Sequence, residues 1–410
     1  MSYPRSKVLE SWCAIAILAS ALATNAIAQN SAQNDVERLE RALTAGIAMG
    51  IPGISAAIGV GDSVVWAGTA GYNDLVRQVP LSINDRFGVG SITKTFVARV
   101  ILQLVAEGKL ELDKTPQEYL DLDIVRSIPN TGTATLRHLL NHQSGIPTWE
   151  FQEDWIRKGR GAEMELGHVW AKTETLKYST NDLLSPTGKP GERYSYSNTN
   201  YTILGLIIEA VTGNDAAAEL RKRLLEPLGL ENTFLESFED VPGGYVHHYH
   251  YATPEFDRAA GVHRGFTQIR PYVVESTAGN LSPEWTAGGI VASASDLVKW
   301  AQELRDGTML TPEMHREALS YYPPRERGDT RRQYLQGISK TKDYYDGHAR
   351  LGHGGGTLGF SAGMYWLEDT DVVVVVLTNI GAMHSGLGMS PVSVFINQLW
   401  FPAVMKYLGR

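Results

Sequence analysis

The chain has 410 residues, of which 43% are hydrophobic and 20% are charged, an ordinary composition for a soluble globular protein. Its 45 acidic side chains outnumber 37 lysines and arginines, so the formal net charge is −8. This charge gives no basic surface for nucleic acid, and we predict no nucleic-acid partner. The length allows two or three structural units.

The first 28 residues are typical of an export signal. Residues 5–7 (RSK) supply positive charge, and residues 13–23 (CAIAILASALA) form an apolar stretch too short to span a membrane. Residues 26–28 (AIA) have the small-x-small form that signal peptidase cuts. We predict removal of residues 1–28, no stable membrane insertion afterwards, and a periplasmic or secreted protein; an uncleaved anchor is the alternative. Cys13, the only cysteine, would leave with the signal.

Two strand pairs lie far apart in the sequence. Residues 54–60 and 63–70 are strand-like, and the Gly-Asp pair at 61–62 suits a hairpin turn. Residues 363–367 and 372–378 form the second predicted hairpin. The latter segment contains five consecutive valines, which favours a strand that is buried on both faces.

The remaining pattern is mostly helical. Residues 35–48, 97–105 and 204–211 have helical spacing or composition, and residues 395–408 are apolar on one side. We predict an α+β fold in which an antiparallel sheet is flanked by N- and C-terminal helices and carries an inserted, mostly helical domain.

Two predicted domains follow the signal, and one of them is built from two separate segments of the chain. Residues 29–112 and 285–410 would form a discontinuous sheet domain, and residues 113–284 the inserted helical domain. We expect the catalytic cleft where they meet, because ligand sites favour domain interfaces.

The stretch GSITKTF places Ser91 and Lys94 at the head of an apolar helix. Their spacing puts both side chains on one helix face, and the helix N-terminus favours developing negative charge. A serine hydroxyl needs a base, and a lysine becomes one near neutral pH through burial or positive neighbours. A second Ser-x-x-Lys copy, at residues 339–342, lacks helical periodicity and is interpreted as a surface or strand-edge segment.

Two further motifs fit the same chemistry. In YSN, Tyr196 can relay a proton, and the Asn198 amide can donate to a substrate carbonyl and accept from Lys94. In GHGGG (residues 352–356), the glycines let a substrate approach the backbone closely, and a free N–H could pair with that of Ser91 as an oxyanion hole.

Together with residues 101–113 (ILQLVAEGKLELD), 135–147 (TLRHLLNHQSGIP) and 287–297 (AGGIVASASDL), these motifs resemble the serine β-lactamase-like and penicillin-binding-protein superfamily. The likeness runs from about residue 40 to about residue 380 and is to class C β-lactamases, D-alanyl-D-alanine carboxypeptidases, D-aminopeptidases and related esterases. It implies a β-lactamase/DD-peptidase-like fold. The implied roles are nucleophile for Ser91, base or partner of the base for Lys94, second proton carrier for Tyr196 and substrate contact for Asn198. His353 to Gly355 would form the third motif, with Gly355 among the residues that contact the substrate, and Gly356 would be the second oxyanion donor.

The sequence departs from the family pattern in the third motif. His353 replaces a lysine, which weakens the β-lactamase interpretation. Gly354 and Gly356 stand where related carboxypeptidases carry hydroxyls for the terminal carboxylate, which argues against strict carboxypeptidase specificity. His353 could instead hold the proton network in its charge state or contact the substrate.

We therefore predict an exported serine hydrolase that acts through a covalent acyl-enzyme on short peptides, as a D-alanyl-D-alanine carboxypeptidase or related peptidase. A small ester is the second substrate class and a β-lactam the third. We expect no cofactor and no metal. Specificity would depend on the loops around residues 149–155 and 243–256. A β-lactam sensor that is acylated without turnover is the alternative of another class.

Two rival patterns remain. Residues 359–363 (GFSAG) match the Gly-x-Ser-x-Gly nucleophile elbow, but a predicted hairpin follows them where a helix is needed. His247, His248 and His250 could bind zinc, although their spacing fits neither one helix face nor one strand face. We interpret that cluster as an aromatic loop bordering the cleft.

Overall fold

The computed structural model describes residues 34–409 apart from 327, 329–330 and 346–347. The predicted export signal lies outside the described residues. Within the part of the chain that the structure describes, no helix is both long and apolar enough to cross a membrane.

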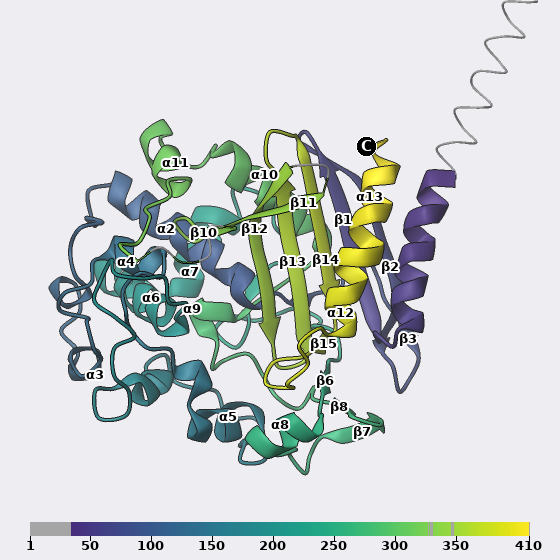
Figure 1. Cartoon of the computed structure of the whole chain (residues 1–410), viewed down its shortest axis with the longest axis horizontal. Coiled ribbons are helices and arrows are strands. Elements are labelled where there is room, and N and C mark those ends of the chain that lie inside the picture. The colour runs from purple at the N-terminus through teal and green to yellow at the C-terminus, as the bar shows by residue number, and fades with distance from the viewer. Residues whose placement is uncertain (1–33, 327, 329–330, 346–347, 410) are drawn as a thin grey trace, which may run out of the picture.

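An eight-stranded antiparallel sheet forms the centre of the fold, with strand order β10-β11-β12-β13-β14-β1-β2-β3 (Figure 1). Its strands are β1 (Gly53–Val60), β2 (Ser63–Asp74), β3 (Val79–Pro80), β10 (Arg332–Tyr334), β11 (Ser339–Tyr345), β12 (His348–Thr357), β13 (Phe360–Leu367) and β14 (Val372–Thr378). Both predicted hairpins are present, and β1 pairs with β14 so that Ala57 lies opposite Val375. Strands from both ends of the chain therefore build one sheet, and the predicted fold class is confirmed.

The five valines of β14 divide between two cores. Val373 and Val375 pack into the core on one face of the sheet, and Val372, Val374 and Val376 pack into the core on the other. Successive side chains of a strand point to opposite faces of the sheet, so every side chain of a strand that is covered on both faces points into a core. This arrangement confirms the prediction made from the valine run.

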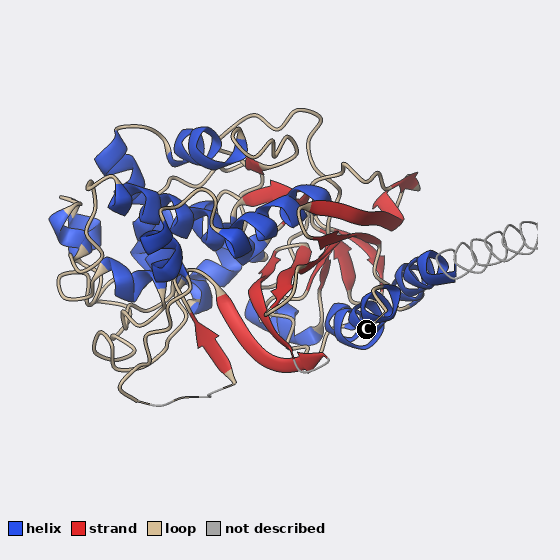
Figure 2. Ribbon diagram, turned by 90° about the horizontal axis from the view of Figure 1, so that it is seen from above, coloured by secondary structure: helices blue, strands red, loops and turns tan. Residues whose placement is uncertain are grey.

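One face of the sheet is covered by the two ends of the described chain. The helix of residues 34–48 lies beside the C-terminal helical run, which comprises α12 (Pro391–Val394), η6 (Phe395–Trp400) and α13 (Phe401–Tyr407) (Figures 1 and 2). Leu43, Trp400 and Phe401 are buried in the core beneath these helices.

The opposite face holds the elements that carry the site. The long helix α2 (Thr93–Ala106) packs against α10 (Ala294–Asp306), where Phe96 stacks on Trp300 at 4.0 Å between ring centroids. The Trp300 indole also donates to Thr95 Oγ1 at 2.7 Å. These contacts fix the first turn of α2, which bears the predicted lysine.

Many helices gather on one side of the molecule, beside the main sheet (Figure 2). Besides α2 and α10, the helical segments between residues 90 and 318 are η1 (Gly90–Ile92), η2 (Pro116–Glu118), α3 (Asp123–Arg126), α4 (Leu136–Leu140), η3 (Trp149–Phe151), α5 (Glu153–Arg160), η4 (Glu174–Ser179), α6 (Asn198–Thr212), α7 (Ala216–Leu220), η5 (Arg221–Leu225), α8 (Pro254–Ala259), α9 (Trp285–Gly288) and α11 (Pro312–Ala318). Helix α6 ends at Gly213, which has the left-handed φ of 70° typical of a C-terminal cap.

Two small sheets add to the predicted architecture. One has the order β15-β6-β8-β7 and the other the order β4-β9-β5. Their strands are β4 (Phe87–Gly88), β5 (Phe234–Leu235), β6 (Tyr249–Tyr251), β7 (Thr267–Arg270), β8 (Val273–Glu275), β9 (Ile290–Ala292) and β15 (Ile380–Gly381). Both sheets join segments from the proposed sheet domain and insertion, so the boundaries at 112/113 and 284/285 stay a prediction.

Candidate active site

The predicted residues converge on a cavity of about 330 Å³ between η1, α9 and β12. Its walls are formed by Ser91, Glu150, Arg160, Tyr196, Asn198, Glu284, Ala287, Gly288, His353, Gly354, Gly356 and Met383. A larger cavity of about 540 Å³, lined by segments between Ala252 and Val274, contains none of the predicted residues. The smaller cavity is therefore the candidate site, because Ser91 in its wall contacts the buried Lys94.

Ser91 lies in the 3₁₀ turn η1, directly before α2. Gly90 precedes it with a left-handed φ of +52°, and a Cβ there would stand 2.6 Å from the Gly356 nitrogen. Only glycine permits both the backbone angle and the close approach of β12. The turn thus presents the serine hydroxyl beside the glycine-rich strand.

Lys94 occupies the first turn of α2 and is completely buried. Its Nζ donates to Ser91 Oγ at 3.0 Å, to Asn198 Oδ1 at 2.7 Å and to the Ala287 carbonyl at 2.6 Å. Burial lowers the pKa of Lys94 to about 7, against the opposing effect of the Glu150 and Glu284 carboxyls. Both protonation states are accessible near neutral pH, as a general base requires.

Tyr196 lies just before α6, with its hydroxyl buried. Lys94 Nζ is 4.9 Å from the centroid of its ring. Burial raises the pKa of Tyr196 well above the ordinary value, and the nearby Ser91 hydroxyl opposes that rise. The phenol is consequently neutral at physiological pH and makes no fixed hydrogen bond, so it can give a proton to a bound molecule.

Asn198 bridges two charged groups. Its Oδ1 accepts from Lys94, and its Nδ2 donates to Glu150 Oε2 at 2.5 Å. These contacts fix the orientation of the amide, since the oxygen must face the lysine and the nitrogen the carboxylate. One N–H of Asn198 is left for the predicted contact to a substrate carbonyl.

The third motif lies on β12, where His353, Gly354 and Gly356 line the cavity. Gly355, predicted as a substrate contact, is not among the lining residues. A Cβ at Gly355 would stand 1.8 Å from the Val89 carbonyl, so this glycine lets β12 pack on the turn that holds the serine.

The sequence predicts that His353 holds the proton network in its charge state or contacts the substrate. In the structure this residue lines the cavity, and both of its ring nitrogens are engaged. Nδ1 is hydrogen-bonded to the Gly354 carbonyl and Nε2 to Tyr334 Oη at 2.9 Å. Burial, together with the Lys94 charge, lowers the pKa of His353 to about 4. The imidazole is therefore neutral and has no free nitrogen for acid–base work.

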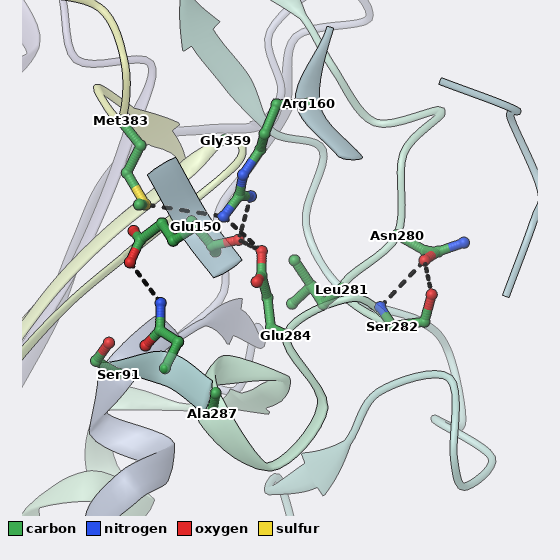
Figure 3. A network of polar contacts seen from close by, with 12 residues as sticks. Ser91, Glu150, Arg160, Asn280, Leu281, Ser282, Glu284, Ala287, Gly359 and Met383 are labelled. Carbon is green, nitrogen blue, oxygen red and sulfur yellow. Dashed lines mark hydrogen bonds and ion pairs between the residues drawn. The ribbon is translucent and has the colours of Figure 1, made fainter. Parts of the chain in front are cut away.

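An acidic network forms the wall opposite the nucleophile (Figure 3). Arg160 pairs with Glu284 at 2.6 Å and donates to Thr357 Oγ1 at 2.9 Å. Glu150 stands beside this pair, and no hydrogen bond joins its Oε1 to another described residue. Burial raises the pKa of Glu150, while Arg160 and Lys94 oppose the rise.

These charged residues were not predicted as site residues. Glu150 falls within the 149–155 segment that was expected to shape specificity. The sequence therefore indicated the loop but not the role of this residue. Arg160 ends α5 and Glu284 precedes α9, and neither stands in a recognisable motif. In a sequence, a lone charged residue gives no sign that it is buried.

The histidine cluster serves as support below the cavity. His250 Nε2 donates to the backbone oxygen of Met383, a cavity-lining residue, at 2.9 Å, and His248 Nδ1 bonds Ser276 at 2.8 Å. His247 instead pairs with Glu275. Across the described residues, no group of three or more His, Cys, Asp or Glu side chains could hold a metal ion.

The rival serine is structural. Ser361 lies within β13, where its hydroxyl donates to the Ile380 carbonyl at 2.9 Å. No helix follows it, so the nucleophile-elbow interpretation of residues 359–363 is wrong.

Comparison with known proteins agrees with the family resemblance that the sequence motifs indicated. The family model described as Beta-lactamase matches residues 36–388. Protein flp of Staphylococcus aureus is 30% identical over 183 residues, covering 45% of this chain and 34% of that protein, so the chain spans about a third of that relative's length.

Two solved structures share the fold. The D-stereospecific amidohydrolase from Streptomyces sp. has 27% identity and a TM-score of 0.71, with 84% of this chain and 94% of that chain covered. The D-amino acid amidase from Ochrobactrum anthropi SV3, complexed with D-phenylalanine, has 24% identity and a TM-score of 0.75, with 92% and 99% covered.

Proposed function

The chain belongs to the β-lactamase family and is a serine hydrolase, and from that premise we propose that it cleaves amide bonds through an acyl-enzyme formed on Ser91. The observation that carries the proposal is the 3.0 Å contact between the Ser91 hydroxyl and a fully buried Lys94 amine. A peptide, amide, ester or β-lactam carbonyl could each react in this way, so the rest of the cavity must select among them.

The proposed acylation moves two protons. Neutral Lys94 takes the proton of Ser91 Oγ as that oxygen attacks the substrate carbonyl carbon. The N–H groups of Ser91 and Gly356 would hold the negative charge that develops on the carbonyl oxygen. Tyr196 gives its proton to the departing amine and regains one from the Lys94 ammonium. In deacylation, water attacks the ester carbonyl carbon and neutral Lys94 takes one of its protons. The bond between that carbon and Ser91 Oγ then breaks, Oγ receives the proton back from Lys94, and the carboxylic acid is released.

We expect kcat/KM to rise tenfold per pH unit below about pH 7 and to level off above it, because Lys94 must lose its proton to act and its pKa is about 7. Tyr196 should add no fall below about pH 10, since its pKa is raised. The measurement is a profile from about pH 3 to 9.5 with an N-acetylated ester that does not itself titrate. A limb centred near pH 4 would assign the base to His353 instead.

The cavity favours a substrate with a positive charge. The Arg160 charge is compensated by Glu284, and two of its nitrogens bond Glu284 and Thr357, which leaves only its buried Nε without a partner among the described residues. Lys94 is held by its catalytic contacts, so neither cation offers an uncompensated charge to a substrate carboxylate. The unbonded Oε1 of Glu150 is instead suited to an ammonium group. We propose that the acyl part of the substrate carries a free amino group, as in an amino-acid amide or the first residue of a peptide.

The proposed substrate thus differs from the one that the sequence predicted. The enzyme would recognise the amino end of a peptide, whereas a carboxypeptidase recognises the carboxylate end. This preference agrees with Gly354 and Gly356 standing where a carboxypeptidase would carry hydroxyls. The printed names of the two solved relatives, a D-stereospecific amidohydrolase and a D-amino acid amidase, support a D-configured acyl residue.

A substrate panel tests the proposal. It contains D- and L-phenylalanine amides with free and N-acetylated amines, a tripeptide ending in D-alanyl-D-alanine, a p-nitrophenyl ester and nitrocefin. We expect the free-amine D-amide to give the highest kcat/KM among the amides, at least about tenfold above its acetylated form, since a charged hydrogen bond contributes about 1.5–3 kcal/mol. Preference for the acetylated amide, or hydrolysis of the tripeptide alone, would overturn it.

Glu150→Gln should raise KM for the free-amine amide about 10- to 100-fold and leave the acetylated amide nearly unchanged. The amide oxygen of glutamine can still accept from Asn198, so the bridge to Lys94 is retained. Removing the Glu150 charge should also shift the acidic limb to lower pH, because that carboxylate raises the pKa of Lys94.

The matched control is Glu153→Gln, an exposed carboxylate three residues along the chain. It should leave both KM values unchanged. Equal losses on free and acetylated amides in the Glu150 variant would show that Glu150 supports the fold of the site and does not bind an ammonium group.

A further inference from the structure

Tyr334 approaches the active site from β10, the edge strand of the main sheet. Its side chain is buried, and its hydroxyl lies 2.9 Å from Nε2 of His353 on β12. Tyr334 does not line the cavity, so it cannot act on a substrate directly. Its hydroxyl can act only through the residues that it contacts.

The hydrogen bonds of His353 identify which nitrogen carries the proton. Nδ1 faces the Gly354 carbonyl, which can only accept, so the ring hydrogen must be on Nδ1. Burial keeps the ring neutral, since the pKa of His353 is about 4. Nε2 then has a lone pair and no hydrogen, and the Tyr334 hydroxyl must donate to it.

The tyrosine ring is also held in place. It packs at 4.6 Å from the His142 ring, which in turn lies 4.1 Å from the Tyr196 ring. His142 Nδ1 accepts from the Ser197 N–H at 3.1 Å, directly after Tyr196. Tyr334 therefore packs between two parts of the site: the segment before α6 that carries Tyr196, and the strand β12 that carries His353.

We propose that Tyr334 is a positioning residue whose hydroxyl donates to Nε2 of His353 and so orients the imidazole and the Gly354–Gly356 wall beside Ser91. The Gly354 carbonyl keeps the ring proton on Nδ1, and Tyr334 holds the opposite nitrogen. Without the Tyr334 hydroxyl, Nε2 has no donor and the ring is held at one nitrogen only, so it can rotate and the wall loses its brace. The kinetic consequence rests on the proposed function, whereas the hydrogen bond does not.

The test is a long-range ¹H–¹⁵N correlation spectrum of the full protein with ¹⁵N-labelled histidine, in which His353→Gln identifies the His353 signals. We expect the parent to show a protonated Nδ1 and an unprotonated Nε2 at neutral pH. Tyr334→Phe retains the aromatic ring and removes the donor, so the Nε2 signal of His353 should shift while Nδ1 stays protonated. An imidazolium or Nε2–H form in the parent, or an unchanged Nε2 signal in the variant, would overturn the proposal.

Kinetics supply the second readout. Tyr334→Phe should lower kcat about 5- to 10-fold with KM nearly unchanged, the effect of one buried hydrogen bond that orients the site. Tyr194→Phe is the matched control, because Tyr194 belongs to the same ring cluster without contacting His353 through its hydroxyl. A shifted Nε2 signal with unchanged kcat would refute the positioning role. A parent protein without any turnover would refute the proposed function, while the result of the spectrum still stands.

Discussion

Ser91→Ala is expected to abolish turnover of every substrate, with kcat reduced about 10⁴- to 10⁶-fold, the range seen when a serine nucleophile is removed. The only other side-chain hydroxyl that lines the cavity is that of Tyr196, whose raised pKa makes it a poor nucleophile. Nothing at the site can therefore replace the lost oxygen. The measurement is kcat/KM of parent and variant on the best substrate of the panel.

The chain provides two controls for this variant. Ser339→Ala changes the second Ser-x-x-Lys copy, which lies on β11, and Ser361→Ala changes the serine of the rejected elbow. Both variants should retain parental kcat. If Ser91→Ala hydrolyses the best substrate as fast as the parent, or if Ser361→Ala is the inactive protein, the assignment of the nucleophile is wrong.

Lys94→Met is expected to lower kcat about 10²- to 10⁴-fold, the contribution of a positioned general base. Methionine fills a similar volume without a charge, so the substitution tests the amine and not the packing. The residual activity should also lack the limb near pH 7, because the group that titrates there is absent. Pre-steady-state acylation rates and a pH profile measure the two effects.

Lys342→Met is the corresponding control, since Lys342 is the exposed lysine of the second motif. It should keep both the parental rate and the limb. A Lys94→Met protein that acylates within about tenfold of the parent, with an unchanged melting temperature, would show that another group removes the proton.

The sequence was sufficient for those features that depend on local spacing. Ser91 and Lys94 are three residues apart at a helix start, and the 3.0 Å contact between them follows from helix geometry. The valine run predicted a doubly covered strand because its composition leaves no solvent-facing position. The convergence of three distant motifs on one cavity came from the family resemblance and not from any local rule.

Other features could not be predicted because they depend on pairs distant in sequence. The Arg160–Glu284 ion pair joins α5 to α9, and its members look like ordinary surface charges in the sequence. Whether such a pair is buried depends on the packing of the whole domain. The small sheets have strands of two to four residues, too short for alternation to be recognised.

The role of each glycine in the motif of residues 352–356 also could not be predicted from the sequence. The sequence indicated that backbone must approach closely near residues 352–356, but not which neighbour approaches which glycine. The structure assigns Gly355 to the contact with Val89 and leaves Gly354 and Gly356 facing the cavity. The sequence also did not indicate that Tyr334, on a three-residue edge strand, engages the His353 ring.

Covalent labelling shows directly whether Ser91 is the nucleophile. The protein is treated with a fluorophosphonate, and its intact mass and tryptic peptides are measured by mass spectrometry. We expect one adduct per chain, on the peptide of residues 87–94 (FGVGSITK) and at Ser91 within it, with no adduct on the Ser91→Ala protein. Equal labelling of the Ser91→Ala protein, or an adduct on any other residue of the parent, would contradict it.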